Sequence, residues 1–529
     1  MKLKVVTQRV EFANGREVPS SRELARALSL MFAVENDTSS SPDLARSCSK
    51  SVESLIFWVD DFAREAAWKV GRTLDDGRRL TPLASVDMEV TEALRRFSLG
   101  CQVSSESWWV VTGPSPKELA WGVDGIVSIT QEGGLSWVIE FDAMQEGDAP
   151  VDASSVDVVG LAVDCAIGRT WNACRDVFSG ARTVHASRPG GTGWLRAWDA
   201  NGSGTLRERM AKLTESALRD ARVSQSDRVI ILAPAQYSSE GNEPKANENF
   251  GSPLSLCIDY EGSVVERPVW GVSHACASGL FAVSLAARIL GTGAADCVVV
   301  AGCTIASDAA QKSMEVVGAV SRTTSRPFAQ NRDGMVLGEG GVALALRRAG
   351  SKSEGSYGVI AGVFCRVWGR EGSAQESLDI SEAIDGALRG VNVEGPGSVV
   401  LVAHATGTAV GDLLELEGIE DAGAALGRDV LVVSHKGLVG HLLHCSALLG
   451  IVHGLSVLGA ESISGTWGLS TGFVLRGGRR VLGEGEFGLR GGVKAAVVNA
   501  LGFGGNVSSV VLMPSRVHDS CGYPRSEDT

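Results

Sequence analysis

From residue 156 onward the chain alternates apolar runs with amphipathic segments, and this alternation limits its fold more than any other feature. Alternating strands and helices are typical of layered α/β proteins, in which helices cover the faces of a largely parallel sheet. In the first half, the pattern predicts strands at 156–164, 228–234 and 297–301 and helices at 169–178, 206–223 and 280–290. Residues 235–267 are expected to be irregular, and a loop is expected to extend to residue 345.

The same rhythm begins again near residue 357. It predicts strands at 357–368, 398–404, 430–434 and within 493–514, and helices at 378–391, 413–426 and 441–458. Two halves of similar rhythm predict an internally duplicated α/β core, although the sequence shows no clean repeat.

Residues 1–150 have a different pattern, which predicts a small α+β domain. The expected elements are a strand at 2–12, helices at 21–35, 42–72 and 86–98, and strands at 107–112, 125–130 and 135–142. A Gln-Glu-Gly-Gly segment at 131–134 predicts a hairpin between the last two strands. This region contains no histidine and no catalytic constellation, so we expect a packing or docking role. Residues 146–155, rich in Gly, Pro, Asp and Ser, are the predicted linker.

Charge and cysteine content exclude several classes of protein. The net charge of −13 argues against general binding of nucleic acid. No run of about 18 apolar residues predicts a membrane span, and the first residues lack a signal-peptide core. Eleven cysteines at scattered spacings fit a reducing cytoplasm better than a disulfide framework. Cys297 and Cys303 have no histidines at ligand spacing, so no metal site is expected.

Cys276 follows a short apolar strand and precedes an apolar helix, in a turn of small residues. We expect it at or just inside the helix N-terminus, where unpaired N–H groups and the helix dipole favour a thiolate. The neighbouring small side chains would let a substrate approach. These residues alone fit equally well a nucleophile or a small cysteine packed in a turn.

Three further motifs stand at predicted strand ends. His404 lies in Val-Ala-His-Ala-Thr-Gly-Thr at 402–408. His441 closes Lys-Gly-Leu-Val-Gly-His at 436–441, and is expected to open a helix that keeps its imidazole neutral. Gly-Phe-Gly-Gly at 502–505 would expose backbone N–H groups to a ligand. Each motif is weak alone, but their order at strand ends predicts one shared active site.

Together these motifs resemble those of the β-ketoacyl-acyl-carrier-protein synthases, the Cys-His-His type of the thiolase-like superfamily. The resemblance covers residues 156–514. Residues 275–279 are similar to that family's nucleophile elbow, 404–408 to its first histidine motif and 436–441 to its second. Two more segments, 326–340 and 502–505, resemble other signatures of the family. The implied fold is a duplicated, layered α-β-α-β-α core, with nucleophile half 156–350 and histidine half 351–515.

The resemblance implies a decarboxylative Claisen condensation. Cys276 would accept an acyl group from a carrier-protein thioester. His404 and His441 would donate hydrogen bonds to the malonyl-type thioester as carbon dioxide leaves. The backbone N–H groups of Cys276 and Phe503 would hold the oxyanion of acyl transfer, and Lys436 would support the second histidine.

The resemblance also implies how substrates and partners are bound. Thr406, Thr408 and Gly504 would contact phosphopantetheine, and Phe503 would gate the acyl pocket. No tightly bound cofactor is implied, because both thioesters arrive activated. The implied partners are an acyl carrier protein and a second subunit, either a copy of this chain or another ketosynthase. Residues 1–150 are a candidate replacement for part of that subunit interface.

An acidic carrier protein requires a basic surface on the enzyme. The candidates near the motifs are Lys312, Arg322, Arg326 and Arg332, although internal ion pairs would explain these cations equally well.

Several positions depart from the family pattern. Ala405 stands where glycine is usual, Gly450 where an acidic residue is usual, and His444 and Cys445 where small residues are usual. Asn506-Val507 replaces the usual Thr-Asn, and the region that forms the acyl pocket and cap is short. These departures favour a specialised pathway and short acyl chains. Two alternatives stay open, a non-elongating acyltransferase using Cys276 and a non-catalytic partner resembling a chain-length factor.

Overall fold

The structure is a computed structural model. It describes residues 3–5, 9–12, 21–34, 51–52, 55–59, 108–113, 125–132, 136–143, 155–183, 195, 205–234, 255–260, 262–305, 308–350, 355–368, 376–393, 395–427 and 429–515.

The first half of the core contains five main strands that pair side by side. Its strands are β9 (Val156–Cys165), β10 (Val229–Pro234), β12 (Ser263–Val272), β13 (Cys297–Thr304) and β14 (Gly340–Arg348). The pairings give the spatial order β12-β10-β13-β14-β9, in which the first three strands are parallel and β14 runs antiparallel to both of its neighbours, β13 and β9. In order of sequence, this arrangement is 3-2-4-5-1.

The second half repeats that order. Its strands are β15 (Gly358–Val367), β16 (Ser398–Val402), β17 (Val430–Val433), β22 (Val493–Gly502) and β23 (Asn506–Met513). They pair as β17-β16-β22-β23-β15, again 3-2-4-5-1 and again with the fourth strand in space, β23, antiparallel to both of its neighbours. Antiparallel pairing of β9 with β15 joins the two halves. The predicted internal duplication is therefore confirmed by topology, although the two sequences have diverged beyond a visible repeat.

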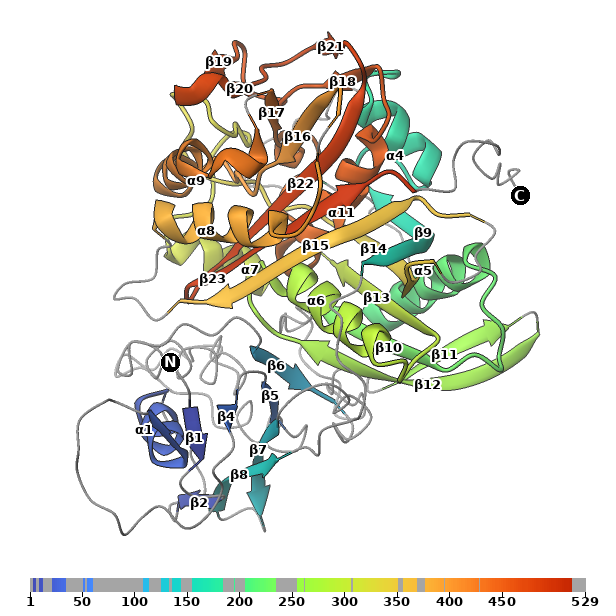
Figure 1. Ribbon diagram of the computed structural model, residues 1–529, viewed down its shortest axis with the longest axis vertical. Helices are drawn as coiled ribbons and strands as arrows, with labels where there is room; N and C mark the ends of the chain where they lie inside the picture. The colour runs from blue at the N-terminus through green and yellow to red at the C-terminus, as the bar shows by residue number, and fades with distance from the viewer. Residues whose placement is uncertain are drawn as a thin grey trace.

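Helices lie between the two sheets and on both outer faces (Figure 1). Helices α6 (Ser278–Gly291) and α11 (Ser446–Val457) contribute their apolar residues to the central core, together with one face of each sheet. Helix α5 (Leu206–Asp220) covers the outer face of the first sheet, and α8 (Ser377–Leu388) that of the second. The strands alternate between cores: Val298 and Val300 face the centre, whereas Val299 packs under α5.

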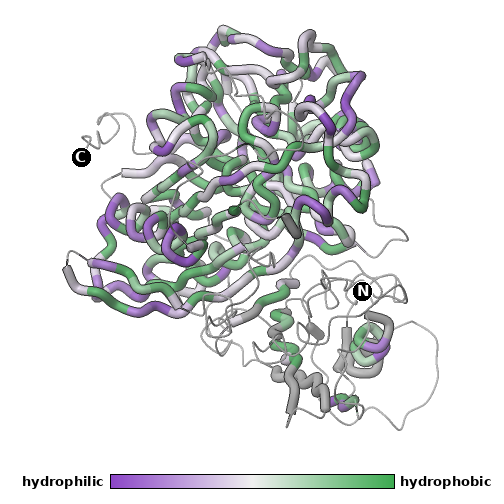
Figure 2. Tube along the Cα trace, turned by 180° about the vertical axis from the view of Figure 1, so that it is seen from behind, coloured by the Kyte–Doolittle hydropathy of each residue, from purple (hydrophilic) through white to green (hydrophobic). Residues whose placement is uncertain are grey.

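Burial on both faces explains why these strands read as nearly continuous apolar runs. Hydrophobic residues concentrate along the inner strands and helices, and hydrophilic ones along peripheral segments (Figure 2). The two central helices approach closely at Gly279, where an added Cβ would lie 3.1 Å from the Ala447 Cβ. The remaining helices of the core are α4 (Trp171–Phe178), α7 (Asp308–Val316), α9 (Ala409–Asp421) and α10 (Lys436–Val439). Short strands complete it: β18 (Ser462–Ser464), β19 (Phe473–Val474), β20 (Arg480–Val481) and β21 (Glu486–Gly488).

The N-terminal segment contains mostly strands in its described part. These are β1 (Leu3–Val5), β2 (Arg9–Phe12), β3 (Phe32–Val34), β4 (Ser51–Val52), β5 (Leu55–Val59), β6 (Trp108–Thr112), β7 (Gly125–Glu132) and β8 (Ser136–Ala143), with helix α1 (Ser21–Met31). Strand β5 pairs in parallel with both β6 and β7, and β7 and β8 form the predicted hairpin.

Strand β6 also joins this segment to the core. Gly271 and Val272 at the end of β12 pair antiparallel with Thr112 and Val111. The backbone N–H of Ser273 donates to the carbonyl of Val110 at 2.9 Å. The N-terminal segment thus contacts the strand that leads directly into the Cys276 turn.

Several predicted elements were wrong. The predicted helix at 42–72 contains β4 and β5 instead. The run Leu-Ile-Phe-Trp-Val at 55–59 is rich in β-branched and aromatic residues, and a short apolar run buried in a parallel sheet shows no period that separates strand from helix. The helix predicted at 21–35 ends at Met31, and the strand predicted at 2–12 is two strands in different sheets. The helix predicted at 86–98 lies outside the described residues.

The core also departs from prediction in two regions. Residues 255–267, expected to be irregular, belong to an antiparallel hairpin of β11 (Ser255–Tyr260) and β12, with Gly262 at φ +96°; only the end of β12, which leads into the Cys276 turn, was predicted as a strand. The expected loop to residue 345 contains α7 and β14. Strand β14 was missed because its Gly-Gly-Val-Ala start lacks bulky residues. Its small side chains fit where it passes between β13 and β9.

Candidate active site

A strained turn between β12 and α6 holds Cys276. Ala275 has φ +50°, an unfavourable conformation for a residue with a Cβ. Ala277 is the N-cap and α6 begins at Ser278, so Cys276 precedes the helix rather than lying inside it. The glycine loop packs on this turn, because a Cβ at Gly502 would lie 2.6 Å from the His274 carbonyl oxygen.

The thiol of Cys276 is not a ready thiolate, which corrects the expectation from the helix terminus. Its side chain is 6% exposed, and burial raises its pKa to about 12. The positive charge of Lys436 acts in the opposite direction and is the largest opposing influence. Desolvation is the largest influence on this pKa, because a thiolate is costly to form in a fully buried site.

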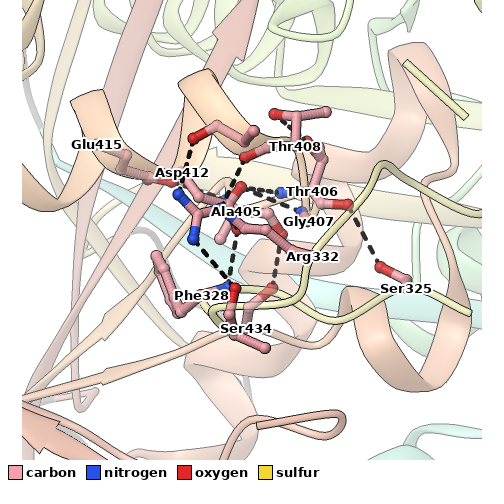
Figure 3. Close-up of polar contacts among 12 residues, drawn as sticks. Ser325, Phe328, Arg332, Ala405, Thr406, Gly407, Thr408, Asp412, Glu415 and Ser434 are labelled. Carbon is pink, nitrogen blue, oxygen red and sulfur yellow. Dashed lines mark hydrogen bonds and ion pairs between the residues drawn. The ribbon is translucent and has the colours of Figure 1, made fainter. Parts of the chain in front are cut away.

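His404 lies in the loop between β16 and α9, which two buried carboxylates hold in place (Figure 3). Glu415 accepts hydrogen bonds from the backbone N–H groups of His404 and Ala405, both at 2.7 Å. The Asn499 amide donates to the same carboxylate at 3.3 Å. The Ala405 carbonyl accepts from the Ser434 hydroxyl at 3.0 Å.

Asp412 holds the other end of this loop. Its carboxylate accepts from the backbone N–H groups of Thr406 and Gly407 at 3.0 Å and of Phe328 at 2.8 Å. Burial raises the pKa of Asp412 to about 6, against the effect of these hydrogen bonds and of Arg332. Glu415 and Asp412 were missed from the sequence. Both lie on one helix three residues apart, just after the first histidine motif, and that spacing was the available signal.

His441 does not open a helix, contrary to prediction. Helix α10 ends at Val439 and Gly440 follows with φ +74°. His441 is then extended: its N–H donates to the Val336 carbonyl at 2.8 Å, and its carbonyl accepts from Gly338 at 3.0 Å. Helix α11 begins only at Ser446. Glycines at both 338 and 440 permit this close crossing, because a Cβ at Gly338 would lie 2.1 Å from the Val439 carbonyl oxygen.

The two predicted catalytic imidazoles lie next to each other in an edge-to-face arrangement. The ring centroids of His404 and His441 are 5.3 Å apart and the rings are perpendicular. Desolvation lowers the pKa of both well below 6.5, and the charge of Lys436 lowers both further. Both rings are therefore neutral near pH 7, so each carries one N–H donor. Neither ring nitrogen of His441 has a hydrogen-bond partner within the described part of the chain.

The buried Lys436 influences the pKa of each titratable group of the candidate site. It is 2% exposed, and desolvation lowers its pKa. Glu415, Cys276 and Asp412 all raise that pKa, in this order of importance. Burial conversely raises the pKa of Glu415, and Lys436 lowers it. The cation thus interacts electrostatically with Cys276, both histidines and the carboxylate that holds the His404 loop.

The remaining predicted residues lie in two loops. Phe503 is 47% exposed at the glycine loop, and Gly504 follows with φ +80°. The hydroxyls of Thr406 and Thr408 are 3.3 Å apart. Gly505 has φ +77°, and a Cβ there would lie 2.7 Å from the Trp368 carbonyl oxygen, so the loop requires glycine at this point.

The four candidate cations for partner binding differ in environment. Lys312 and Arg322 are exposed. Arg326 pairs with Asp333 at 3.1 Å. Arg332 is largely buried and donates to the carbonyls of Ala329, Thr408 and Ala409, which makes it a support of the His404 loop.

Two of the positions that depart from the family pattern are filled by packed side chains. His444 lies 3.2 Å, through Nε2, from the Cys303 carbonyl oxygen, and Cys445 contacts the Thr304 hydroxyl at 3.3 Å. At Gly450 an added Cβ would lie 2.7 Å from Val498 Cγ1, so this structure leaves no room for an acidic side chain there without rearrangement. Among the described residues, no cluster of His, Cys, Asp and Glu fits a metal ion, and no helix is long and apolar enough to cross a membrane.

Comparison with known families places this site in context. Residues 255–351 match the profile of the beta-ketoacyl synthase N-terminal domain, and residues 357–469 match that of its C-terminal domain. The 3-oxoacyl-[acyl-carrier-protein] synthase 2 of Vibrio cholerae is 29% identical over 270 residues, which cover 46% of this chain and 62% of that protein. The tetracenomycin polyketide synthase ketoacyl synthase alpha subunit of Streptomyces glaucescens is 32% identical over 206 residues, covering 36% of this chain and 48% of that protein.

Solved structures share the same fold. The ketosynthase from module 6 of the bacillaene synthase of Bacillus subtilis 168 has a TM-score of 0.54 and 18% identity, and the match covers 68% of this chain and 72% of that chain. The ishigamide ketosynthase/chain length factor has a TM-score of 0.54 and 17% identity, and the match covers 68% of this chain and 99% of that chain. The chain spans less than two thirds of the length of the curated relatives described above. The α/β core of this chain is therefore similar to the β-ketoacyl synthases in sequence, and it shares the fold of solved ketosynthases.

Proposed function

We propose that this chain is a condensing enzyme, an acyltransferase that joins an acyl thioester to a malonyl-type thioester with loss of carbon dioxide. The proposal assigns Cys276 as nucleophile and His404 and His441 as hydrogen-bond donors in the decarboxylation. Its main support is the pair of neutral imidazoles, whose ring centroids are 5.3 Å apart. The charge of the buried Lys436 acts on both of these rings and on Cys276.

In the first half-reaction, the Cys276 sulfur attacks the acyl thioester carbonyl and the carrier thiol leaves. The sulfur reacts as its thiolate, which burial disfavours and Lys436 favours. The tetrahedral oxyanion requires donors, and we assign the backbone N–H groups of Cys276 and Phe503 to this role. Close packing of Gly502 on the His274 carbonyl keeps the glycine loop against the nucleophile turn.

In the second half-reaction, carbon dioxide leaves the malonyl-type thioester and an enolate forms. Its oxygen needs donors that are not themselves acids of low pKa, and two neutral imidazoles meet this need. Burial with Lys436 nearby keeps both rings neutral, and each oxyanion donor is typically worth about 3 kcal/mol of transition-state stabilisation. The enolate carbon then attacks the acyl group on Cys276, which releases the thiolate.

Substrates and partners are part of the same proposal. Both thioesters would be carried on the phosphopantetheine of an acyl carrier protein, contacted at Thr406, Thr408 and Gly504, so no tightly bound cofactor is needed. Lys312 and Arg322 are the candidate docking cations, since Arg326 and Arg332 bind within the chain. A second ketosynthase-like subunit, as in the ishigamide ketosynthase/chain length factor, is a candidate partner. We also retain the cytoplasmic location predicted from the scattered cysteines and the specialised biosynthetic role.

Product analysis tests this function. The full chain is incubated with a panel of short acyl-carrier proteins and malonyl-carrier protein, and the carrier-bound product is measured by mass spectrometry. We expect a β-ketoacyl product with wild type and none with Cys276→Ala. Double replacement His404→Ala, His441→Ala should abolish condensation but leave acylation of Cys276. An acyl group passed unchanged to another acceptor would replace the proposal with simple acyl transfer. Absence of any acylation across the panel would favour the non-catalytic partner.

A further inference from the structure

A chain of three hydrogen bonds runs from the N-terminal segment to the glycine loop through a buried histidine. The Val110 backbone N–H donates to Nε2 of His274 at 3.0 Å. Nδ1 of His274 lies 2.8 Å from Oδ1 of Asn506. The Asn506 amide nitrogen in turn donates to the Phe503 carbonyl at 2.7 Å. His274 lies two residues before Cys276, and its role could not be predicted from the sequence.

The donor and acceptor of each of these three hydrogen bonds are determined by the groups present. Because Nε2 accepts from a backbone N–H, the ring proton must be on Nδ1, which then donates to Asn506 Oδ1. That bond fixes the Asn506 amide so that its NH₂ group faces the Phe503 carbonyl. An imidazolium could not accept from Val110. Burial lowers the His274 pKa to about 3, which keeps the ring neutral across the physiological range.

The ring is also held rigidly by its surroundings. His274 is fully buried and stacks on Phe281 of α6, with centroids 3.7 Å apart and planes 10° from parallel. Its backbone N–H donates to the Ser278 hydroxyl at 2.8 Å, and that hydroxyl donates to the Ala275 carbonyl at 2.6 Å. A displacement of β6 would therefore act on the ring, and the ring on the nucleophile turn and on Asn506.

We propose that His274 is a positioning residue, through which docking of strand β6 fixes the glycine loop that carries Phe503. This inference rests on the proposed function only for its catalytic consequence, because the loop would supply an oxyanion donor. The N-terminal segment would then be part of the active-site scaffold. Loss of the histidine would loosen β6 and the glycine loop together, although they are distant in sequence.

Hydrogen exchange on the full chain tests this link without any assumption about activity. The test variant is His274→Phe, which keeps an aromatic ring against Phe281 and removes both hydrogen bonds. We expect exchange of residues 108–112 and 502–506 to accelerate about tenfold or more, as for loss of buried hydrogen bonds. The matched control is His453→Phe. His453 is also buried and stacked on a phenylalanine, Phe178, but neither of its ring nitrogens has a hydrogen-bond partner among the described residues. That control should leave both segments unchanged.

The opposite end of the chain gives a second test, should His274→Phe fail to fold. Asn506→Ala removes the bond to the ring while leaving β6 untouched. We expect faster exchange at residues 108–112 as well as at the glycine loop. Unchanged exchange of β6 in Asn506→Ala, or of the glycine loop in a folded His274→Phe, would overturn the proposal.

Kinetics then examine the catalytic consequence. His274→Phe should lower kcat about tenfold or more with little change in KM for the acyl-carrier protein, because the donor rather than the binding surface is displaced. His274→Asn, whose amide can still donate toward Asn506, should recover part of that loss. A purely structural role would lower the amount of folded enzyme without such rescue. If wild type condenses nothing while the exchange results hold, the proposed function fails and the structural link stands.

Discussion

Glu415 accepts hydrogen bonds from two consecutive backbone N–H groups, those of His404 and Ala405, and is also the largest influence that raises the pKa of Lys436. One carboxylate therefore both shapes the loop of a candidate catalytic histidine and stabilises the positive charge of the buried lysine.

Replacement Glu415→Gln should lower kcat and move its pH dependence. Without the anion, burial lowers the Lys436 pKa further, so the lysine loses its proton at lower pH. The alkaline limb of the kcat profile should move to lower pH, and kcat at pH 7 should fall roughly tenfold to a hundredfold through loss of positioning at His404. A kcat profile measured from pH 6 to pH 10 tests this. An alkaline limb that stays in place would contradict the role assigned to Lys436.

Alkylation of Cys276 by iodoacetamide should increase with pH without levelling off below about pH 10. A thiol with a pKa near 12 gains thiolate about tenfold per pH unit throughout this range. Lys436→Met should slow alkylation below about pH 8, where Lys436 carries its charge and lowers the Cys276 pKa, and should change it little at higher pH. Peptide mapping separates Cys276 from the other cysteines, and Cys276→Ala provides the blank. A plateau near neutral pH would show an activated thiolate instead.

Asp412→Asn should destabilise the fold in a pH-dependent way. The folded-state pKa is raised from 3.8 to about 6, so the carboxyl contributes stability below pH 3.8 that is lost as the pH rises through about 6. The asparagine variant lacks this titration. Its deficit in free energy of unfolding should therefore shrink by about 1–3 kcal/mol between pH 4 and pH 8.

Urea unfolding at the two pH values measures this difference. The matched control is Asp421→Asn, on the same helix but with a half-exposed side chain that pairs with Arg476. Its effect should stay below about 1 kcal/mol. An equal deficit for Asp412→Asn at both pH values would argue that the carboxylate is ionised throughout.

Gly338→Ala should displace His441. The added Cβ would lie 2.1 Å from the Val439 carbonyl oxygen, and Gly338 also donates to the carbonyl of His441. We expect roughly 1–3 kcal/mol of destabilisation and a fall in condensation larger than the fall in Cys276 acylation. Gly488→Ala is the control, because an added Cβ there meets nothing within 4 Å. Thermal unfolding and the two half-reaction rates measure the outcome, and unchanged condensation would be evidence against His441.

The site residues that could be predicted from the sequence are of uncommon types and lie at the ends of predicted strands. Cys276, His404, Lys436 and His441 could be found because a nucleophile, histidines and a lysine stand out in apolar runs. Glu415 and Asp412 could not, since acidic residues on a helix usually face solvent and burial cannot be read from spacing. His274 was missed for a related reason: its partners Val110 and Asn506 are 164 and 232 residues away.

The strands and helices, like the site residues, were predicted where their own sequence is distinctive and missed where distant contacts decide the structure. Strands buried on both faces, such as β13 and β17, were predicted from continuous apolar composition. The β11–β12 hairpin was missed because some of its solvent-facing positions carry the apolar residues Cys257 and Val264, which obscure the polar alternation of a half-exposed strand. The start of α11 was misplaced because the turn at Gly440 and the extended His441 depend on hydrogen bonds to the segment around Gly338, a tertiary contact.

Intact-protein mass spectrometry would show whether Cys276 carries the acyl group that condenses with the malonyl-type thioester. Wild type and Cys276→Ala are incubated with an acyl-carrier protein, and malonyl-carrier protein is then added. We expect an acyl adduct on wild type, absent in Cys276→Ala, that disappears on malonyl addition as carbon dioxide and a β-ketoacyl-carrier product form. An adduct of equal size on Cys276→Ala, or an adduct that malonyl-carrier protein leaves intact, would contradict it.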